Sequence, residues 1–243
     1  MATSETASVD LSKGSYTFTL TVSDGELSDS DEVNVTVENA IPVADAGSDQ
    51  TLEATGSTTA VTLDGSGSND VDGDEITYAW STGDTTVSPT VNLGVGVHTI
   101  TLTVTDEDGA TASDEVTITI TDTTAPIISY NQVVGNLWPP NHKMVLVITG
   151  ISANDIVDGA TEVTVTVVSS QPANGVGDGN TDSDYEIVTK SDGTIDVYVR
   201  SERSGRGNSG RTYTINMSTI DSEGNSSSDS TTVTVAQNQG RGR

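Results

Sequence analysis

A period-two alternation of apolar and polar residues recurs along this chain and restricts it to a β-sheet fold. In each alternating run every second residue is apolar, and the residues between are mostly Thr, Ser, Asn or Asp. This is the pattern of strands with one buried and one solvated face, separated by turn residues. No segment has a helical period. The runs cover residues 16–22, 33–37, 61–63, 98–104, 116–120, 163–168, 194–199, 213–217 and 233–235.

One hairpin is repeated three times. The segment SYTFTLTV from Ser15 matches VHTITLTV from Val97, and a weaker copy, RTYTINMS, begins at Arg211. Each copy continues through an Asp and a Gly-containing turn into a Val-rich strand, as in the last hairpin of a β-sandwich. Prolines after the first two copies suit short, stiff linkers. The predicted domains are 1–40 (the final hairpin of a partial module), 41–122, 123–236 and a C-terminal tail, 237–243.

Length and composition favour several small modules. The 243 residues suffice for two sandwiches of roughly 100 residues each. Only 33% of residues are hydrophobic and 4% aromatic, so each core must be thin. We therefore predict an all-β fold of tandem immunoglobulin-like β-sandwich modules. Because cysteine is absent, disulfides cannot reinforce these small cores, and bound metal is the alternative.

The charge balance limits the partners. The net charge of −27, from 36 acidic and 9 basic residues, destabilises a compact state unless cations neutralise it. Nucleic acid and anionic membrane surfaces are excluded as partners. No run of apolar residues is long enough to insert into a membrane, and the N-terminus does not have the pattern of a signal peptide. We expect a fragment or mature portion of a larger secreted protein.

The middle module carries a family resemblance. Its motif residues are Gly65, Ser66, Ser68, Asp70, Asp72, Gly73, Asp74, Tyr78, Trp80, Gly83 and Asp84, followed by Thr103-Val104-Thr105-Asp106. Their spacing resembles the polycystic-kidney-disease (PKD) domain family over about a third of the chain. The sequence WSTGD departs from the family's Trp-Asp-Phe-Gly-Asp run. The resemblance implies an immunoglobulin-like sandwich of the kind repeated in secreted and cell-surface proteins.

The third module contains NLWPPNHKMVLV. This segment resembles an immunoglobulin-like module of secreted multidomain bacterial proteins that is marked by Leu-Trp-Pro-Pro-Asn-His-Lys. The resemblance supports the fold and an extracellular or cell-surface location, and it implies no mechanism.

Clustered aspartates are the candidate metal ligands of the middle module. Alternate acids around a turn glycine at 70–74 can converge on one hard cation, and calcium takes 6–8 oxygen ligands. The hairpin turn at 106–108 is expected at the same end of the sandwich. Some PKD members bind calcium at the matching loops, whereas the alternative is a solvated, Asx-rich turn. The predicted ligands are Asp45, Asp70, Asp72, Asp74, Asp106 and Asp108.

A weaker cluster is predicted in the third module. One loop corresponds to residues 70–74, and Asp221 aligns with Asp106. With no cysteine and two histidines, the excess of oxygen donors favours calcium over zinc. The predicted ligands are Asn154, Asp155, Asp158 and Asp221.

Three features are candidate partner surfaces. Trp138 could stack on a sugar or pack beneath the two prolines that follow it. The arginines could bind an acidic polysaccharide or an acidic neighbour, or pair internally with Glu202 and residues 182–186. Residues 1–40 would leave an apolar face uncovered, either because the fragment ends arbitrarily or because a neighbouring module or subunit supplies strands. The arginines are Arg200, Arg203, Arg206 and Arg211.

Catalytic motifs are absent from the sequence: it has no nucleophile elbow, HExxH, phosphate loop or cysteine. Its acid pairs lie on turns, which suits metal binding better than proton transfer in a closed cleft. We predict a non-enzymatic, calcium-binding extracellular segment with a structural, adhesive or fibre-forming role. The alternative is a carbohydrate-binding accessory module of a secreted hydrolase.

Overall fold

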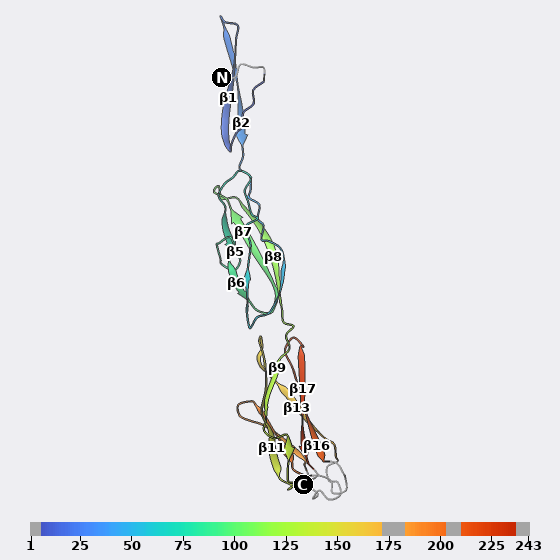
Figure 1. The fold of residues 1–243 in the computed structure, drawn as a ribbon. Coiled ribbons are helices and arrows are strands. Elements are labelled where there is room, and N and C mark those ends of the chain that lie inside the picture. The colour runs from blue at the N-terminus through green and yellow to red at the C-terminus, as the bar shows by residue number, and fades with distance from the viewer. Residues whose placement is uncertain (1–5, 172–182, 203–209, 237–243) are drawn as a thin grey trace. The chain divides into compact units, whose positions relative to one another are not determined.

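The computed structural model describes residues 6–171, 183–202 and 210–236, and these residues form strands and loops without an α-helix (Figure 1). All nine predicted runs fall on strands, so the all-β prediction is confirmed. Over the described ranges, no helix of a length and hydropathy suited to crossing a membrane occurs. The chain divides into two compact units, Met1–Leu52 with Ala60–Ile120, and Glu53–Thr59 with Thr121–Arg243.

The first strands of unit 1 form a separate two-stranded hairpin. Strands β1 (Gly14–Ser23) and β2 (Ser28–Val37) pair antiparallel over their whole length. Leu20 and Val22 are 67% and 58% exposed, because no second sheet covers this face within the described structure. The uncovered apolar face predicted from the sequence is therefore present.

The middle module is a sandwich built from a four-stranded and a two-stranded sheet (Figure 1). Its core is rich in Val, Ile and Leu, with Trp80 buried as predicted and its indole N–H donating to Thr86 O at 2.9 Å. Gly65 lies against Trp80 and Leu102, where a side chain would clash. The larger sheet has the order β3 (Gln50–Glu53), β8 (Thr111–Thr121), β7 (Gly96–Thr105) and β5 (Thr77–Trp80), and the smaller pairs β4 (Thr59–Thr62) with β6 (Thr90–Leu93).

Unit 2 contains a larger sandwich. Its core includes Val147, Ile151, Val197, Tyr213 and Ile215, all fully buried. One sheet has the order β10 (Asn136–Leu137), β17 (Ser226–Val235), β16 (Arg211–Ile220) and β13 (Val163–Ser169). The other has the order β12 (Gly159–Thr161), β11 (Met144–Asp155), β15 (Ile195–Arg200) and β14 (Tyr185–Thr189), with β9 (Ile127–Gln132) also paired to β11.

Candidate metal centres

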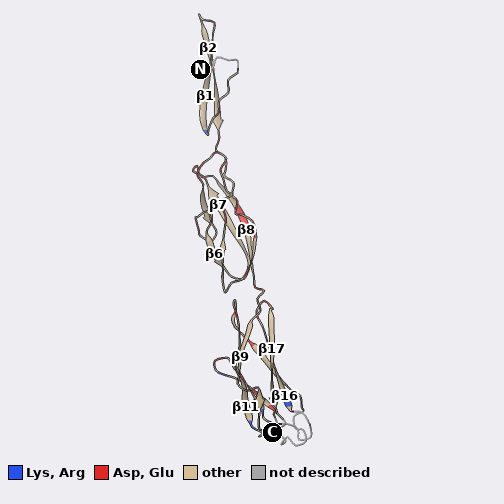
Figure 2. Ribbon diagram, in the orientation of Figure 1, with Lys and Arg blue, Asp and Glu red and all other residues tan. Residues whose placement is uncertain are grey.

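The first acidic cluster consists of Asp70, Asp72 and Asp74, together with the turn aspartates Asp106 and Asp108. Each of the first three offers a carboxylate oxygen, and these oxygens lie within 4.8 Å of one another. The loop is held locally, because Asp70 Oδ1 accepts a hydrogen bond from Asp72 N at 2.7 Å. Figure 2 shows acidic positions of the middle module in its loops and on β8.

A lysine bridges the two loops of this cluster. Lys13 Nζ donates to Asp74 Oδ2 and to Asp108 Oδ2, each at 2.5 Å. These two bonds raise the pKa of the Lys13 ammonium above its ordinary value. The loops at 70–74 and 106–110 therefore lie together, as the sequence predicted. The ammonium group of Lys13 already places one positive charge between them.

Asn39, which follows β2, completes the first cluster. Its Nδ2 donates to Asp106 Oδ2 at 2.9 Å, and Ala110 N donates to Asp106 Oδ1 at 2.8 Å. Burial alone would raise the pKa of Asp106, but these hydrogen bonds hold it below its usual value. Asn39 Oδ1 and Asp70 Oδ2 are buried without a hydrogen-bond partner in the described structure. Two acceptors are thus available to a cation.

Asp45 has a different environment. Its Oδ1 accepts from Gly47 N at 2.9 Å, and its carboxylate lies against Gly67, where any side chain would clash. It is not in the group of carboxylates at 70–74. The geometry gives Asp45 a role in shaping its turn.

The second acidic cluster lies in unit 2 and consists of Asp122, Asp155, Asp221 and Glu223. Asp122, Asp221 and Glu223 each offer a carboxylate oxygen, and these oxygens are within 4.8 Å of one another. Asp155 ends β11, and its charge is near enough to raise the pKa of Asp122. Two segments therefore bring three acids together, and Asp155 is close enough to affect the pKa of one of them.

Burial and neighbouring carboxylates disfavour the charged form of Asp122 in the second cluster. Burial, and then repulsion from Asp155, Asp221 and Glu223, raise the pKa of Asp122 despite a hydrogen bond from Thr124 N. Burial also pushes the pKa of Asp221 upward, but hydrogen bonds from Asn225 and the turn backbone bring it below its usual value. Like charges at this separation repel strongly in a poorly solvated site.

The structure brings together only part of the predicted second set. Asp155 and Asp221 belong to the cluster. Asp158 instead accepts from Ser222 N at 2.8 Å, and Asn154 Nδ2 donates to Asp155 O at 3.0 Å. Asp158 and Asn154 therefore hold the loops around the cluster, and neither is among the three grouped carboxylates.

Asp122 and Glu223 were missed by the sequence analysis. A signal for Asp122 was available, because the repeat aligns it with Asn39, and each residue closely follows the closing strand of its hairpin. Glu223 lies in the turn between β16 and β17, and the repeat aligns this turn without a gap with residues 106–109, which places Glu223 at the position of Asp108. The predicted ligand Asp108 was therefore a signal for Glu223.

Arg211 is not available to a partner, contrary to one prediction. Its side chain is fully buried, with Nη1 donating to Glu202 Oε1 at 3.2 Å and Nη2 donating to Asp184. Nε donates to Ser169 Oγ at 2.8 Å. The alternative of internal pairing describes this arginine, because burial requires its charge to be neutralised.

Two further predicted partner residues, Arg200 and Trp138, lie within the described structure. Arg200 donates to the backbone oxygens of Ser183 and His142, at 2.9 and 3.0 Å. Trp138 is 42% exposed. Arg203 and Arg206 lie outside the described residues.

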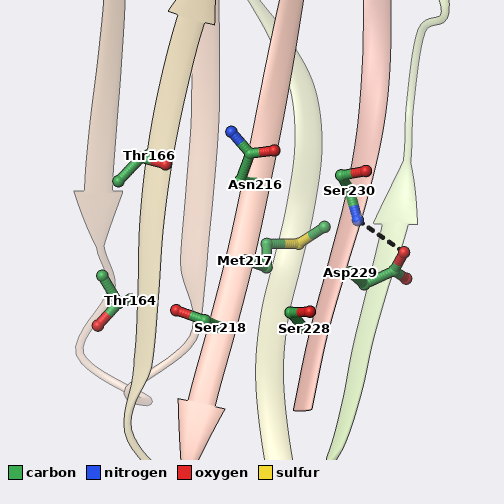
Figure 3. Close-up of a pocket in the computed structure, with 8 residues that line it drawn as sticks. All are labelled: Thr164, Thr166, Asn216, Met217, Ser218, Ser228, Asp229 and Ser230. Carbon is green, nitrogen blue, oxygen red and sulfur yellow. Dashed lines mark hydrogen bonds between the residues drawn. The ribbon is translucent and has the colours of Figure 1, made fainter.

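A shallow polar groove of about 380 Å³ crosses β13, β16 and β17 (Figure 3). Hydroxyl and amide groups line it, and Met217 is the one large apolar residue among its lining. No aromatic side chain lines the groove to provide a stacking surface. Its lining residues include Thr164, Thr166, Asn216, Ser218, Ser228 and Ser230.

Comparison with known proteins supports the fold and the middle module. Residues 39–121 match the PKD domain family, which confirms the predicted resemblance. No curated protein matches the chain.

Several solved structures resemble parts of the chain. A nucleoside hydrolase-related hypothetical protein from Saccharophagus degradans, associated with carbohydrate metabolism, is 27% identical over 35% of this chain, with a TM-score of 0.29. PcdhgB3 EC1-4 is 18% identical over 90%, with a TM-score of 0.41, and Drosophila N-cadherin EC1-4 is 14% identical over 94%, with a TM-score of 0.35. The matches cover 26%, 56% and 60% of those chains, respectively.

Proposed function

We propose that this chain is a non-catalytic segment of an extracellular or cell-surface protein, with a structural or adhesive role, whose PKD module binds calcium at the first acidic cluster. The PKD match and the all-β fold support the class of module. The acidic groups lie on turns at the ends of strands, a position that suits metal binding better than catalysis.

The Lys13 bridge is the observation that carries the calcium proposal. An ammonium group bonded to both Asp74 and Asp108 indicates that these loops attract a cation. Asp70 Oδ2 and Asn39 Oδ1 would add two buried oxygen ligands. Calcium prefers oxygen ligands such as carboxylates and amides, and water can complete its coordination shell.

Calorimetric titration of the full, EDTA-treated chain with calcium tests the proposal. The variant Asp72→Asn/Asp74→Asn should lose one equivalent of bound calcium and part of the calcium-dependent rise in melting temperature. A matched control, Glu75→Gln/Glu107→Gln, removes two charges from the same loops and should keep that equivalent. Equal binding by both variants would contradict the proposal.

The hairpin is the proposed contact with a neighbour. Leu20, Val22 and Val33 are more than half exposed on paired strands, and two-stranded hairpins are marginally stable alone. We expect a neighbouring module or subunit to cover this face with strands. Light scattering of the chain with and without Leu20→Thr/Val22→Thr measures self-assembly, and unchanged association would exclude the hairpin.

A carbohydrate-binding accessory module is the second candidate, favoured by the exposure of Trp138. Aromatic side chains with an open face can bind apolar faces of ligands. A glycan array comparing the chain with Trp138→Ala tests this function. Signal that survives the substitution would exclude Trp138 as the binding surface.

A further inference from the structure

We propose a second calcium site in unit 2, formed by Asp122, Asp155, Asp221 and Glu223. It shares with the proposed function the premise that calcium is the cation, but it uses none of the residues of the first acidic cluster. Two of its four ligands, Asp122 and Glu223, were not among the ligands predicted from the sequence.

The proposal begins with the convergence of three segments. Asp122 follows β8, Asp155 closes β11, and Asp221 and Glu223 lie in the turn between β16 and β17. The oxygens that Asp122, Asp221 and Glu223 offer are all within 4.8 Å of one another. A single ion could contact these three carboxylates. Asp155 would be the fourth ligand, because its loop is bonded to the same turn, where Asp158 Oδ2 accepts a hydrogen bond from Ser222 N at 2.8 Å.

Two buried, unpartnered oxygens are the independent observation that points to a ligand. Asp122 and Asp155 are only 6% and 3% exposed, and the Oδ2 atom of each has no hydrogen-bond partner in the described structure. Buried acceptors are normally paired, and an unpaired one costs free energy because it has lost its water. A cation would satisfy both.

Among the residues that the structure describes, no lysine or arginine neutralises these acids. Within residues 6–171, 183–202 and 210–236, no Lys or Arg forms an ion pair with any of the four acids, although buried Asp184 and Glu202 are paired with Arg211. A buried charge is tolerated when it is paired or when it coordinates a metal. The second cluster has the features of the metal-coordinating case.

The hydrogen bonds around the cluster orient the remaining oxygens. Thr124 N holds Asp122 Oδ1 at 3.0 Å, and Val157 N holds Asp155 Oδ1 at 2.7 Å. Asn225 Nδ2 donates to Asp221 Oδ2 at 2.9 Å and to the backbone oxygen of Asp122 at 3.0 Å. One oxygen of both Asp122 and Asp155 is thereby fixed while the other stays available.

The ligand set favours calcium among common cations. All four side chains are carboxylates, which suit hard cations, and the site has neither sulfur nor imidazole. Calcium accepts irregular shells of 6–8 oxygens, whereas magnesium demands a near-ideal octahedron and retains its water. Four carboxylates from three loops, completed by water, fit calcium better.

Calorimetric titration of the full, EDTA-treated chain separates this site from the first. Asp122→Asn/Asp155→Asn should lose one equivalent of calcium, whereas the charge-matched control Glu162→Gln/Glu186→Gln, on two exposed residues, should not. The Asp72→Asn/Asp74→Asn variant should still bind one equivalent, which the four-fold variant loses. Magnesium should compete at least about 10-fold more weakly than calcium.

The outcomes distinguish the two proposals. If Asp72→Asn/Asp74→Asn binds no calcium, or if Asp122→Asn/Asp155→Asn retains as many equivalents as the wild type, the second site is overturned. If the wild type binds one equivalent that only Asp122→Asn/Asp155→Asn abolishes, the second site stands and the first fails. Equal binding of magnesium would overturn the assignment to calcium.

A milder variant guards against misfolding. Circular dichroism would reveal whether Asp122→Asn/Asp155→Asn folds. If it does not, Glu223→Gln, on an exposed turn residue, should weaken calcium binding by roughly 10-fold or more while leaving the spectrum unchanged. Unchanged affinity in Glu223→Gln would then overturn the site.

Discussion

The two acidic clusters stand at equivalent places in successive modules, yet they neutralise their charge differently. In the first, Asn39 follows the closing hairpin strand and donates a hydrogen bond to buried Asp106, and Lys13 supplies a positive charge. In the second, Asp122 occupies the place of Asn39 and brings another negative charge with an unpartnered oxygen. The exchange of an amide for a carboxylate thus separates a cluster that contains a lysine from one whose acids form no ion pair with Lys or Arg among the described residues.

The largest expected effect is the loss of calcium from the second cluster. At a calcium concentration 100 times Kd, binding would stabilise the native state by about 2.7 kcal/mol. Adding EDTA should therefore lower the melting temperature of the wild type more than that of Asp122→Asn. Scanning calorimetry of both proteins measures the difference, and equal shifts would remove the contrast between the clusters.

Asn39→Asp should give the first cluster the chemistry of the second. In EDTA the variant loses the amide donor to Asp106 and places two carboxylates together, which should cost about 1–3 kcal/mol of unfolding free energy. Calcium should recover much of that loss. Urea unfolding with and without calcium measures both effects, with Asn34→Asp on the exposed face of β2 as control. A loss that calcium does not reduce would show that Asn39 only shapes the loop.

Lys13→Met should sharpen the comparison by removing the internal counter-ion. Because Asp74 and Asp108 would no longer be bonded to an ammonium, calcium should bind the first cluster severalfold more tightly. Titration of Lys13→Met, with Lys13→Arg as the charge-conserving control, measures this change. Tighter binding in both variants would show that charge competition is not the cause.

The smallest expected effect is on the pH dependence of stability in EDTA, to which Asp106 and Asp122 should contribute with opposite signs. The pKa of Asp106 is lowered by folding, so its stabilisation is present above the unfolded pKa of 3.8 and is lost as pH falls through the folded value. The pKa of Asp122 is raised, so its contribution becomes unfavourable as pH rises from 3.8 through the folded value. Relative to the wild type, Asp106→Asn should lose stability at neutral pH and Asp122→Asn should gain it. Urea unfolding between pH 3 and 7 measures how the unfolding free energy of each variant, relative to the wild type, changes with pH. Changes of the same sign in both variants would show that this assignment is wrong.

The alternating strands and the repeated hairpin could be predicted because their pattern is local. Strand β11 was not among the predicted runs: it pairs with three strands, and its register shifts between Leu146 and Ile148 and again between Ile148 and Ile151, which interrupts the alternation. A period-two reading cannot follow a strand across such irregularities.

The candidate sites could be predicted only in part. The acids at 70–74 were visible because they lie within five residues of one another in sequence. The second cluster joins residues about 100 positions apart. For Arg211 the sequence allowed either an external partner or internal pairing with Glu202 and residues 182–186, and only the fold decides between the two. Burial and long-range pairing determine these roles, and neither is written in local spacing.

The Lys13 bridge also has a mechanical consequence. The chain enters the hairpin at Gly14 and leaves it at Val37, and these residues are paired at the same end of the ladder. Tension applied through the two ends would therefore separate β1 from β2 one residue pair at a time, and an antiparallel hairpin resists this direction of force least. Lys13 lies next to Gly14 and is anchored to Asp74 and Asp108. A force on the chain before Lys13 must break these ion pairs before it can separate Gly14 from Val37.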